Sequence, residues 1–580
     1  VSPQNFFKTE DEVTSALYGV YEKLHNIYIG DYEKIFIGDI GVDIMITRQS
    51  PRIDVYQYYL LEAPTVEYST MWKDHYSAIG AANMVINRIN ASSNLKEEFK
   101  NKIIGEVRFL RAFFYYNLVQ LWGDVPMWLD ELELEKVSAL SRTPKAEVIS
   151  QIITDMEFAA SNLPHHWELK NQGRVTKWCA KAMLSRICLL ENQWQKAYDL
   201  SKEIIQSSPH KLLTNYNDIF NWKNKFNDEL IFIVPSLTDI KGSQIHSFTN
   251  PRGRDESNKV ATAFAEGKTA LRPDGVSVSS STQLFQGWGM FNSTKNLLAS
   301  YEDGDKRKEI MDWHSLTLSD GSIVTFDGGD GGGTGHYTLK WMAFDEKANN
   351  GSRDIHQIRL GEIYLILAEA ANELNQPNEA IEALNKLRER AFGDNAHNYA
   401  STLSKEEIKK AIVNENKWEL AGEGVRRWYL IQYEAYKSGK AKQDFLEDVE
   451  KRRAERDKSP LDDAKPKTLT VQVDGQAYRV TVAYGDIDLP ASATEKVTAP
   501  PVGEGQDVPA PLEGKFFLTK NAQETPLKVG DKVKSGDLLC YIEAMKTYNA
   551  IRADFDGTVV AICVNPGDSV SEDDVLMKIG

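Results

Sequence analysis

A lysine near the C-terminus is the residue of this chain whose setting most clearly suggests chemistry. Lys546 follows Glu543, Ala544 and Met545 and stands between two short apolar runs. If the runs are strands joined by a two-residue turn, the lysine lies at the tip of a hairpin. An exposed lysine at a turn is usually only a solvated charge, so the surrounding sequence must decide whether its amine has a role.

The sequence on either side of Lys546 is an imperfect repeat. Three segments before it have counterparts after it, namely 510–514 with 553–557, 530–533 with 567–570, and 538–542 with 575–579. Two half-repeats of short strands with one lysine at their joint predict a quasi-twofold β-barrel that displays this lysine at one end.

This pattern resembles the biotinyl/lipoyl carrier family over about residues 508–580, and Glu-Ala-Met-Lys marks the biotinyl branch. The resemblance implies a small, flattened all-β barrel whose Lys546 is joined to biotin through an amide. A biotin ligase would make this bond, reading Ala544 and Met545. Biotin would then carry carboxylate between carboxylase and carboxyltransferase or decarboxylase subunits, so the domain itself would be non-catalytic.

Two features depart from the usual carrier pattern. Thr547 stands where these carriers commonly have a second Met, which bears on recognition by partner proteins. The first half-repeat is also longer than the second, because residues are added around 519–526. This addition either resembles the protruding thumb of some biotin carriers or is an ordinary loop insertion.

The bulk composition limits the partners and the compartment. A chain of 580 residues predicts two or three domains, and a formal charge of −16 makes a nucleic-acid backbone an unfavourable partner. We find no apolar run of the roughly 18 residues that a membrane span requires. The chain opens without a signal peptide, which suggests a processed leader or a fragment. The four cysteines stand in apolar runs without metal-ligand spacing and are expected to be buried: Cys179, Cys188, Cys540 and Cys563.

Helical periodicity dominates the first part of the chain. Apolar spacing predicts helices over about 9–24, 66–89, 98–121 and 144–162. Thr143 is the expected N-cap of the last of these, with Pro144 at its first position. Helical hairpins with small residues at the crossing, similar to tetratricopeptide repeats, are expected at 174–206 and 358–391.

Less regular segments separate and follow these helices. Residues 212–350 are rich in Gly, Ser and Asn and are interrupted by aromatics, which predicts irregular surface loops able to carry a binding site. A charged helix at 444–456 is expected to precede two short strands, 469–473 and 478–482, with a turn at 474–475. A Pro/Ala/Thr/Gly-rich tether follows.

Several motifs give the first three-quarters of the chain a second resemblance. They stand in family order at 108–118, 122–126, 173–177, 301–307, 358–365 and 419–428. This part resembles the SusD/RagB family of outer-membrane nutrient-binding lipoproteins. The resemblance implies an α-helical, tetratricopeptide-like scaffold with long loops. It also implies capture of an oligosaccharide or peptide at the cell surface for nutrient uptake through a TonB-dependent, SusC-like transporter.

The two resemblances define a multidomain chain. The expected parts are 1–435, a SusD-like domain; 436–466, a helical junction; 467–487, a β segment; 488–507, the tether; and 508–580, the carrier. They belong in different compartments, since biotin attachment is cytoplasmic and nutrient capture is on the outer-membrane surface. No lipobox cysteine is present, and the carrier replaces the usual SusD C-terminal segment. We therefore expect a composite chain joined around 430–466. The alternative is a biotin carrier subunit alone, with the SusD part an assembly or fusion artefact.

The candidate glycan contacts are aromatic side chains with polar neighbours, because sugar C–H faces stack on rings and hydroxyl groups need hydrogen-bond partners. We select Trp72, Trp288 and Trp341, with Asn83 and Asp43 as polar partners. Trp72 and Asn83 have the alternative of packing a helix pair. Trp288 stands between two glycines and is harder to bury in a regular element.

Catalytic and metal sites are not expected. The chain has 84 carboxylates, but none stands in a recognisable hydrolase setting. His165 and His166 are adjacent and cannot share a helix face. Asp303 and Asp305 imitate the start of a calcium loop but lack its later acidic ligands.

Overall fold

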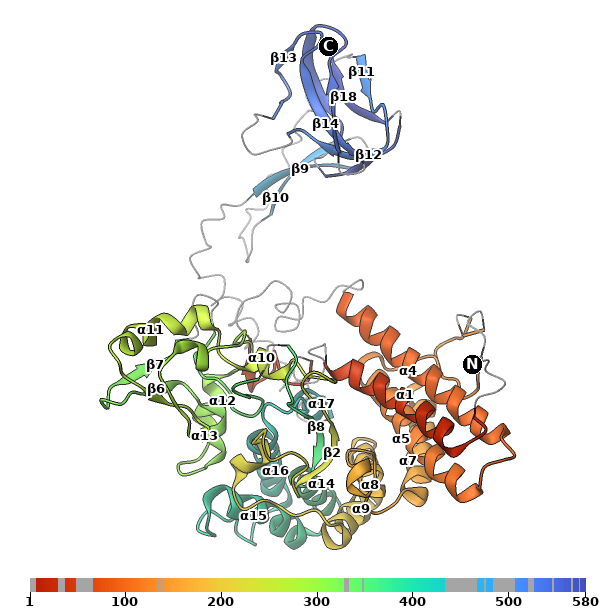
Figure 1. Ribbon diagram of the computed structural model, residues 1–580, viewed down its shortest axis with the longest axis vertical. Coiled ribbons are helices and arrows are strands. Elements are labelled where there is room, and N and C mark those ends of the chain that lie inside the picture. The colour runs from red at the N-terminus through yellow and green to blue at the C-terminus, as the bar shows by residue number, and fades with distance from the viewer. Residues whose placement is uncertain are drawn as a thin grey trace. The chain divides into compact units, whose positions relative to one another are not determined.

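The computed structural model describes residues 7–29, 37–47, 66–132, 136–137, 139–327, 333–346, 349–432, 467–473, 476–482, 506–519, 526–544, 547–564, 567–572 and 574–580. The chain forms two compact units, Val1–Arg456 and Asp457–Gly580 (Figure 1). The first is mainly helical and the second is built of strands, which confirms the predicted fold class.

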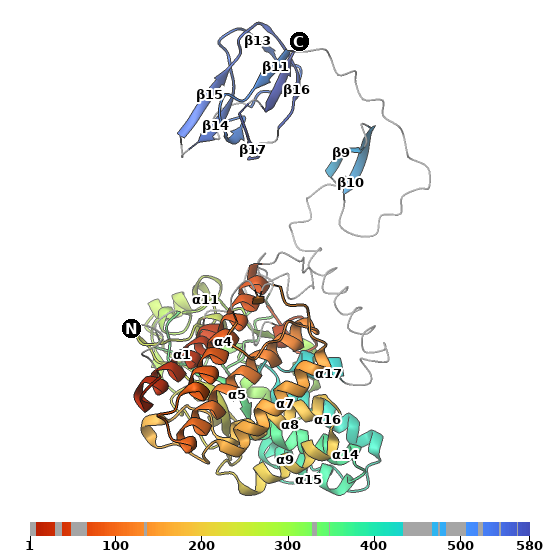
Figure 2. The same cartoon turned by 90° about the vertical axis from the view of Figure 1, so that its right-hand side faces the viewer.

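The N-terminal unit is a succession of helices in which each packs on its neighbour in sequence (Figure 2). The helices are α1 (Glu10–Ile29), α4 (Val66–Ala91), α5 (Glu97–Trp122), α7 (Lys145–Asn162), α8 (Lys177–Leu190), α9 (Trp194–Ser207), α14 (Leu360–Glu373), α15 (Pro377–Phe392), α16 (Lys405–Leu420) and α17 (Arg426–Gln432). The pairs α8/α9 and α14/α15 are the two predicted hairpins, and α9 packs on α14. Both hairpin predictions are confirmed.

The start of α7 differs from the prediction by one residue. The helix begins at Lys145, and Pro144 occupies the N-cap position without a side-chain hydrogen bond. Thr143 is unable to act as the cap, because its backbone forms an antiparallel bridge with Val125 through two hydrogen bonds of 3.0 and 3.2 Å. The tertiary pairing therefore overrides the local capping preference.

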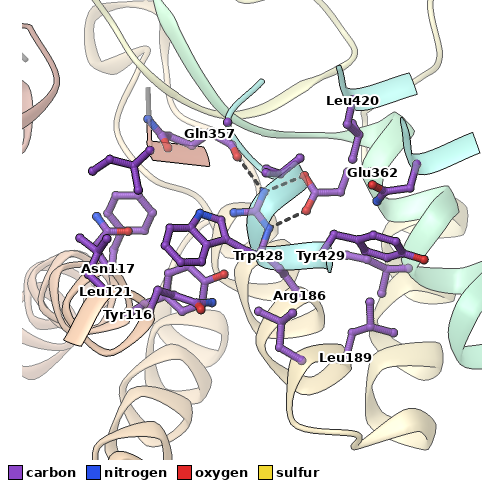
Figure 3. A pocket seen from close by; sticks show the side chains of 18 of the residues that line it. Tyr116, Asn117, Leu121, Arg186, Leu189, Gln357, Glu362, Leu420, Trp428 and Tyr429 are labelled. Carbon is purple, nitrogen blue, oxygen red and sulfur yellow. Dashed lines mark hydrogen bonds and ion pairs between the residues drawn. The ribbon is translucent and has the colours of Figure 1, made fainter. Parts of the chain in front are cut away.

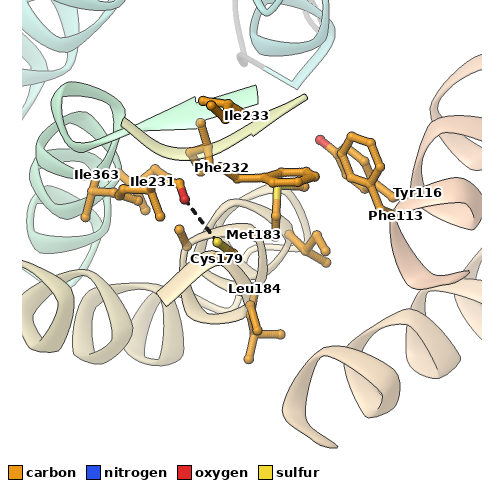
Figure 4. Packing of buried hydrophobic residues seen from close by; sticks show 14 of the residues in the cluster. Phe113, Tyr116, Cys179, Met183, Leu184, Ile231, Phe232, Ile233 and Ile363 are labelled. Carbon is orange, nitrogen blue, oxygen red and sulfur yellow. Dashed lines mark hydrogen bonds between the residues drawn. The ribbon is translucent and has the colours of Figure 1, made fainter. Parts of the chain in front are cut away.

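A two-stranded sheet at the centre of the helical unit was not predicted. β2 (Leu230–Val234) pairs antiparallel with β8 (Ile355–Arg359), and every residue of both strands is buried. Phe232 lies edge-on against Phe109 and Phe113 of α5, with ring centroids 5.0 and 5.2 Å apart. The thiol of Cys179 donates to the carbonyl of Ile231 at 3.0 Å (Figure 4).

The cysteine prediction holds for three of the four residues. Cys179, Cys188 and Cys540 are buried, whereas Cys563 is exposed. Cys563 comes directly after strand β16 (Gly557–Ile562). Beyond the end of a strand, side chains no longer alternate between the two faces of the sheet, so the pattern does not predict whether Cys563 is buried.

The Gly/Ser/Asn-rich region has more structure than the predicted loops. Its short elements are η3 (Tyr216–Phe220), α10 (Ile245–Thr249), α11 (Gly253–Ala265), η4 (Ser281–Gln283), α12 (Lys295–Ser300), α13 (Arg307–Met311) and the strands β3 (Ala270–Leu271), β4 (Ser277–Val278), β5 (Asn292–Ser293), β6 (Ser315–Thr317) and β7 (Ile323–Thr325). β3 pairs with β4, β6 with β7, and β5 with β1 (Met45–Ile46). Leu284, Phe285, Trp313 and Phe326 belong to a separate hydrophobic cluster in this region. Scattered aromatics without periodicity thus form a second core.

The C-terminal unit begins with the antiparallel hairpin of β9 (Lys467–Val473) and β10 (Gln476–Val482), which confirms the two predicted strands. Two four-stranded sheets follow, ordered β11-β18-β16-β13 and β15-β14-β12-β17. Their strands are β11 (Gln506–Pro509), β12 (Gly514–Phe517), β13 (Lys532–Val533), β14 (Leu538–Ala544), β15 (Thr547–Arg552), β16, β17 (Ser569–Val570) and β18 (Val575–Ile579). The predicted junction helix, the turn at 474–475, residues 488–505 of the tether and residues 520–525 of the insertion lie outside the described residues.

The half-repeats of the sequence are equivalent in space. A β-carbon added at Gly514 would lie 2.5 Å from Cγ2 of Ile542, and one added at Gly557 would lie 2.5 Å from Cγ2 of Ile579. The amide of Gly530 donates to Val559, and that of the matching Gly567 donates to Phe516. Corresponding residues therefore make corresponding contacts, as a quasi-twofold barrel requires.

Candidate functional site

Residues of the SusD-like sequence motifs meet in one buried charge network. Ten side chains take part, five basic and five acidic, and all are buried: Arg307, Arg359, Arg388, Arg390, Lys340, Asp305, Glu229, Glu415, Glu419 and Glu423. They come from α13, β8, α15 and α16 and from four residues outside these elements, Glu229, Asp305, Lys340 and Glu423; equal numbers of opposite charges compensate one another there. Five of the ten belong to the motifs, namely Asp305, Arg307, Arg359, Glu419 and Glu423, and because they are buried in the scaffold they are closed to a ligand.

Glu419 lies at the centre of this network. Its carboxylate accepts from Arg359 at 2.6 Å, from Arg307 at 3.3 Å and from Arg390. Burial opposes ionisation, but the three arginines outweigh it and hold the pKa of Glu419 well below its usual range. Asp305 is also part of the network. Its buried carboxylate forms an ion pair with Arg307 at 2.7 Å, so the carboxylate serves as the partner of an arginine and not as the first ligand of a calcium loop.

Trp341 borders the network and is not a ligand platform. Its side chain is completely buried, and its indole N–H donates to the carbonyl of Gly422 at 2.5 Å. The prediction of Trp341 as a glycan contact is therefore wrong. The contacts that enclose Trp341 come from residues distant in the sequence, such as Gly422 and His356, whose ring lies 5.2 Å from the indole, so the sequence could not reveal its burial.

Asn83 is likewise a structural residue, and its predicted role in ligand binding is wrong. It is completely buried; its amide oxygen accepts from Arg111 at 2.8 Å, and its amide nitrogen donates to Trp128 at 2.9 Å. Trp72 is half-buried, and its ring lies edge-on to Trp122 at 5.2 Å. These contacts join α4 to α5 and its following segment, which is the arrangement that the packing alternative describes.

Asp43 is engaged in an ion pair with the last SusD-like motif. Both of its carboxylate oxygens accept from Arg426, at 3.0 and 2.7 Å. The neighbouring Asp39 accepts the backbone amides of Gly424 and Arg426 at 2.7 and 3.1 Å. The segment around residues 39–43 is thereby fixed to the start of α17.

Trp288 has a different environment from every other tryptophan. Of the twelve tryptophans, all of which the structure describes, Trp288 alone is exposed, with 37% of its surface accessible. Its ring packs against buried Phe248 with centroids 4.7 Å apart, and its backbone N–H donates to Ser247 at 2.6 Å. A β-carbon at Gly287 would lie 2.0 Å from the carbonyl oxygen of Asn250, so glycine is needed for this close approach.

The backbone of Asn349 shares a hydrogen-bond partner with that of Trp288, although the two residues are far apart in the sequence. The hydroxyl of Ser247 accepts the backbone N–H of Asn349 at 2.9 Å, while the carbonyl of the same serine accepts that of Trp288. Asn349 is exposed. Sequence reasoning missed Asn349, because 61 positions separate it from Trp288 and only Ser247 brings the two together.

Two pockets of the unit are poor matches for an oligosaccharide. One of ≈120 Å³ lies between the N-terminal helices and α14/α17, where Arg186 makes two bonds to Glu362 of 2.5 and 2.7 Å (Figure 3). This is small beside the roughly 300–1,000 Å³ of ordinary ligand sites. A groove of ≈230 Å³ contains Trp167, but the guanidinium of Arg174 lies 4.0 Å above that ring and occupies its face.

The position of Lys546 is bracketed by two paired strands. β14 ends at Ala544 and β15 begins at Thr547, and these two residues are antiparallel partners. Met545 and Lys546 lie between them in the sequence, outside the described residues. The strands around the lysine are therefore those predicted from the sequence.

A further group of side chains escaped sequence reasoning. Asp312, His314 and His336 offer donor atoms that all lie within 4.8 Å of one another. The two histidines are 22 positions apart, without a spacing that signals a ligand set. His165 and His166, by contrast, are exposed and lie outside any helix or strand.

Comparison with known proteins identifies both units. A family described as "Starch-binding associating with outer membrane" matches residues 2–189, and one described as "SusD family" matches residues 327–468. SusD-like protein P25 of Formosa agariphila is 30% identical over 469 residues, covering 75% of this chain and 84% of that protein. The chain belongs to the SusD family. Among solved structures, a laminarin binding SusD-like protein shares the fold of this SusD unit, with a TM-score of 0.63 and 24% identity over 76% of this chain and 94% of that one.

The C-terminal domain of this SusD-family chain is a biotin/lipoyl domain. A family described as "Biotin-requiring enzyme" matches residues 506–579. The biotin carboxyl carrier protein of acetyl-CoA carboxylase from Cyanidium caldarium is 42% identical over 74 residues, which are 13% of this chain and 49% of that protein. The chain thus spans about half the length of that relative. Within the described residues, no helix has both the length and the apolar character needed to cross a membrane.

Proposed function

We propose that the SusD unit captures an oligosaccharide at the outer-membrane surface on a platform formed by Trp288 and Asn349. The observation that carries the proposal is the exposure of Trp288 in a loop fixed by backbone hydrogen bonds on both sides. A fixed aromatic ring can stack on a sugar face at little entropic cost, and the exposed amide of Asn349, whose backbone is bonded to the same serine, can bond its hydroxyl groups. This ligand class is supported by the matching family, described as starch-binding, and by the laminarin binding protein of the same fold.

An exposed platform suits a transient complex. A ligand on a surface can be released without opening the protein, as capture for a transporter requires. We therefore extend the proposal to delivery of the glycan to a TonB-dependent transporter. The buried motif network would serve this function by holding the loops in place, because it joins α13, β8, α15 and α16.

Calorimetric titration of the full chain with laminarin- and starch-derived oligosaccharides tests the platform. Trp288→Ala should weaken the binding of the responding oligosaccharide by roughly 1–3 kcal/mol, and Asn349→Ala should weaken it by about 1 kcal/mol. The matched control is Tyr18→Ala, which removes another exposed aromatic ring, 47% accessible, from α1. Equal binding by Trp288→Ala and the parent, or loss of binding in Tyr18→Ala alone, contradicts the platform.

We also propose that the C-terminal domain carries biotin on Lys546. The residues present fit the group: a lysine amine can form the amide bond, and the two residues Met545 and Lys546 join strands that are paired up to Ala544 and Thr547. When attached, biotin supplies carboxyl transfer between partner subunits. The chain itself contributes the barrel that fixes the ends of β14 and β15, and Ala544 and Met545 as the residues that the ligase reads.

Coexpression with a biotin ligase and measurement of the intact mass test the attachment. The parent should gain one biotin, Lys546→Arg should gain none, and Lys532→Arg should behave as the parent. Lys532 is the matched control because it is an exposed lysine of β13 in the same domain. Biotin at any other lysine would refute the assignment.

Both units have a function in this proposal. The alternative of a biotin carrier alone is not favoured, because the SusD part aligns with most of a SusD-like relative and forms a compact unit with its own core. We place glycan capture at the outer-membrane surface and biotin attachment in the cytoplasm, in a composite chain. The intact mass of the protein from its native host tests this arrangement, since it reports chain length, biotin and lipid together.

A further inference from the structure

Backbone pairing in the second core places three polar side chains on one face. Trp313 and Tyr337 exchange two backbone hydrogen bonds of 3.0 Å each in an antiparallel bridge. In such a ladder the next residues, His314 and His336, lie directly opposite each other, and the side chains of neighbouring pairs point to opposite faces. Asp312, two positions before His314, shares its face.

The opposite face of this pair is fixed by burial. Trp313 and Tyr337 are both buried in the hydrophobic cluster of the second core, where Trp313 lies edge-on to Phe326 and Phe344. The three polar side chains lie on the face opposite the buried Trp313 and Tyr337 and therefore point outward. Their side chains are accessible to 16% for Asp312, 42% for His314 and 24% for His336.

The three groups converge on one point. Oδ1 of Asp312 lies 2.8 Å from Nδ1 of His314 and 2.5 Å from Nδ1 of His336, and the imidazole rings are 5.0 Å apart. Within the part of the chain that the structure describes, no other group of three His, Cys, Asp or Glu side chains converges in this way.

We propose that Asp312, His314 and His336 bind a divalent transition-metal ion of the zinc type. Two imidazoles and one carboxylate are ligands that Zn²⁺ accepts, whereas Mg²⁺ and Ca²⁺ prefer oxygen alone. Ligand atoms at about 2.0 Å from a tetrahedral ion are roughly 3.3 Å apart, so the two separations between Asp312 and the imidazoles need to widen by less than about 1 Å. Rotation of the partly exposed side chains supplies this change. Three protein ligands leave a fourth position open to water or another ligand.

Such an ion would tie residues 312–314 to residue 336. Tyr337 in turn supports the loop of the proposed platform, since its ring lies 3.3 Å from the position of a β-carbon at Gly289. The ion should therefore raise the thermal stability of this region. The metal site itself does not depend on the proposed glycan function.

The test is titration of the chelator-treated, full-length protein, without a histidine tag, with Zn²⁺ in a calorimeter. One ion per chain is expected, and Co²⁺ substitution should give visible absorption bands. His314→Ala, His336→Ala and Asp312→Asn should each weaken binding by at least about tenfold, because even outer-shell partners of metal ligands contribute that much. His397→Ala is the matched control: its imidazole is 41% accessible and lies 3.8 Å from Glu302, without a second histidine.

Folding and metal binding are separated by two further measurements. Circular dichroism shows whether a variant retains the parent's helices, and His314→Gln retains a polar side chain of similar reach. Zn²⁺ should raise the melting temperature of the parent but not of the folded His314→Gln. Absence of Zn²⁺ binding by the parent, or undiminished binding by the three variants, overturns the site.

Discussion

Removal of a single charge from the buried network tests whether the SusD motifs are structural. Glu419→Gln keeps the shape of the side chain but removes its negative charge from α16, where the residue is completely buried. The ten-residue network then has five basic and four acidic groups. The new amide also presents a donor nitrogen toward arginine donors that need an acceptor.

The expected cost follows from this imbalance. Taking one partner from a buried ion pair leaves an uncompensated charge in a region of low dielectric, which costs about 3–5 kcal/mol. The same substitution at Glu131 is the matched control. Glu131 also binds an arginine through two contacts, of 2.9 and 2.8 Å to Arg88, but these side chains are 41% and 38% accessible. An exposed pair contributes roughly 0–1 kcal/mol.

Urea unfolding followed by helical circular dichroism measures the difference. The helical signal reports the SusD unit, because the described residues of the C-terminal unit form strands and no helix. Glu419→Gln should lower the free energy of unfolding by several times the loss found for Glu131→Gln. If the two variants lose equal amounts, the network does not hold the scaffold, and the structural interpretation of the motifs is wrong.

Three other measurements test further parts of the structure. Against the effect of burial, Arg359 and Lys340 lower the pKa of Glu423 from 4.5 to about 2. The contribution of Glu423 to stability is therefore complete above pH 4.5 and is lost as the pH falls toward 2. Unfolding measured at decreasing pH should show this loss of stability, and the loss should be smaller in Glu423→Gln. Exposed Cys563 should react with a thiol reagent in the native protein. Cys540 should react only after unfolding, because burial raises its pKa to about 12. Mass spectrometry of labelled peptides distinguishes the two cysteines, and equal labelling would contradict the burial of Cys540. Limited proteolysis should cut the predicted tether at 488–507 and release a fragment of about residues 508–580, whereas cuts spread evenly through the barrel would contradict a separately stable domain.

The sequence by itself determined those features that depend on local periodicity. Apolar residues at helical spacing specified α8/α9 and α14/α15, because a helix must bury one face wherever its partner lies. The internal repeat specified the quasi-twofold barrel, since equivalent residues such as Gly514 and Gly557 meet equivalent constraints. The motifs specified the family because their order is a property of the chain.

Only the tertiary structure decided which polar and aromatic residues are accessible. Exposure depends on neighbours distant in the sequence. The indole N–H of Trp341 donates to the carbonyl of Gly422, and the guanidinium of Arg111 donates to the amide oxygen of Asn83. The same reason explains why β2 and β8, more than 100 positions apart, were not predicted to pair. Asn349 reaches Trp288 through Ser247, and His336 reaches His314 through a backbone bridge. No local pattern encodes such meetings, because they arise from long-range packing and hydrogen bonding that form only when the whole unit folds.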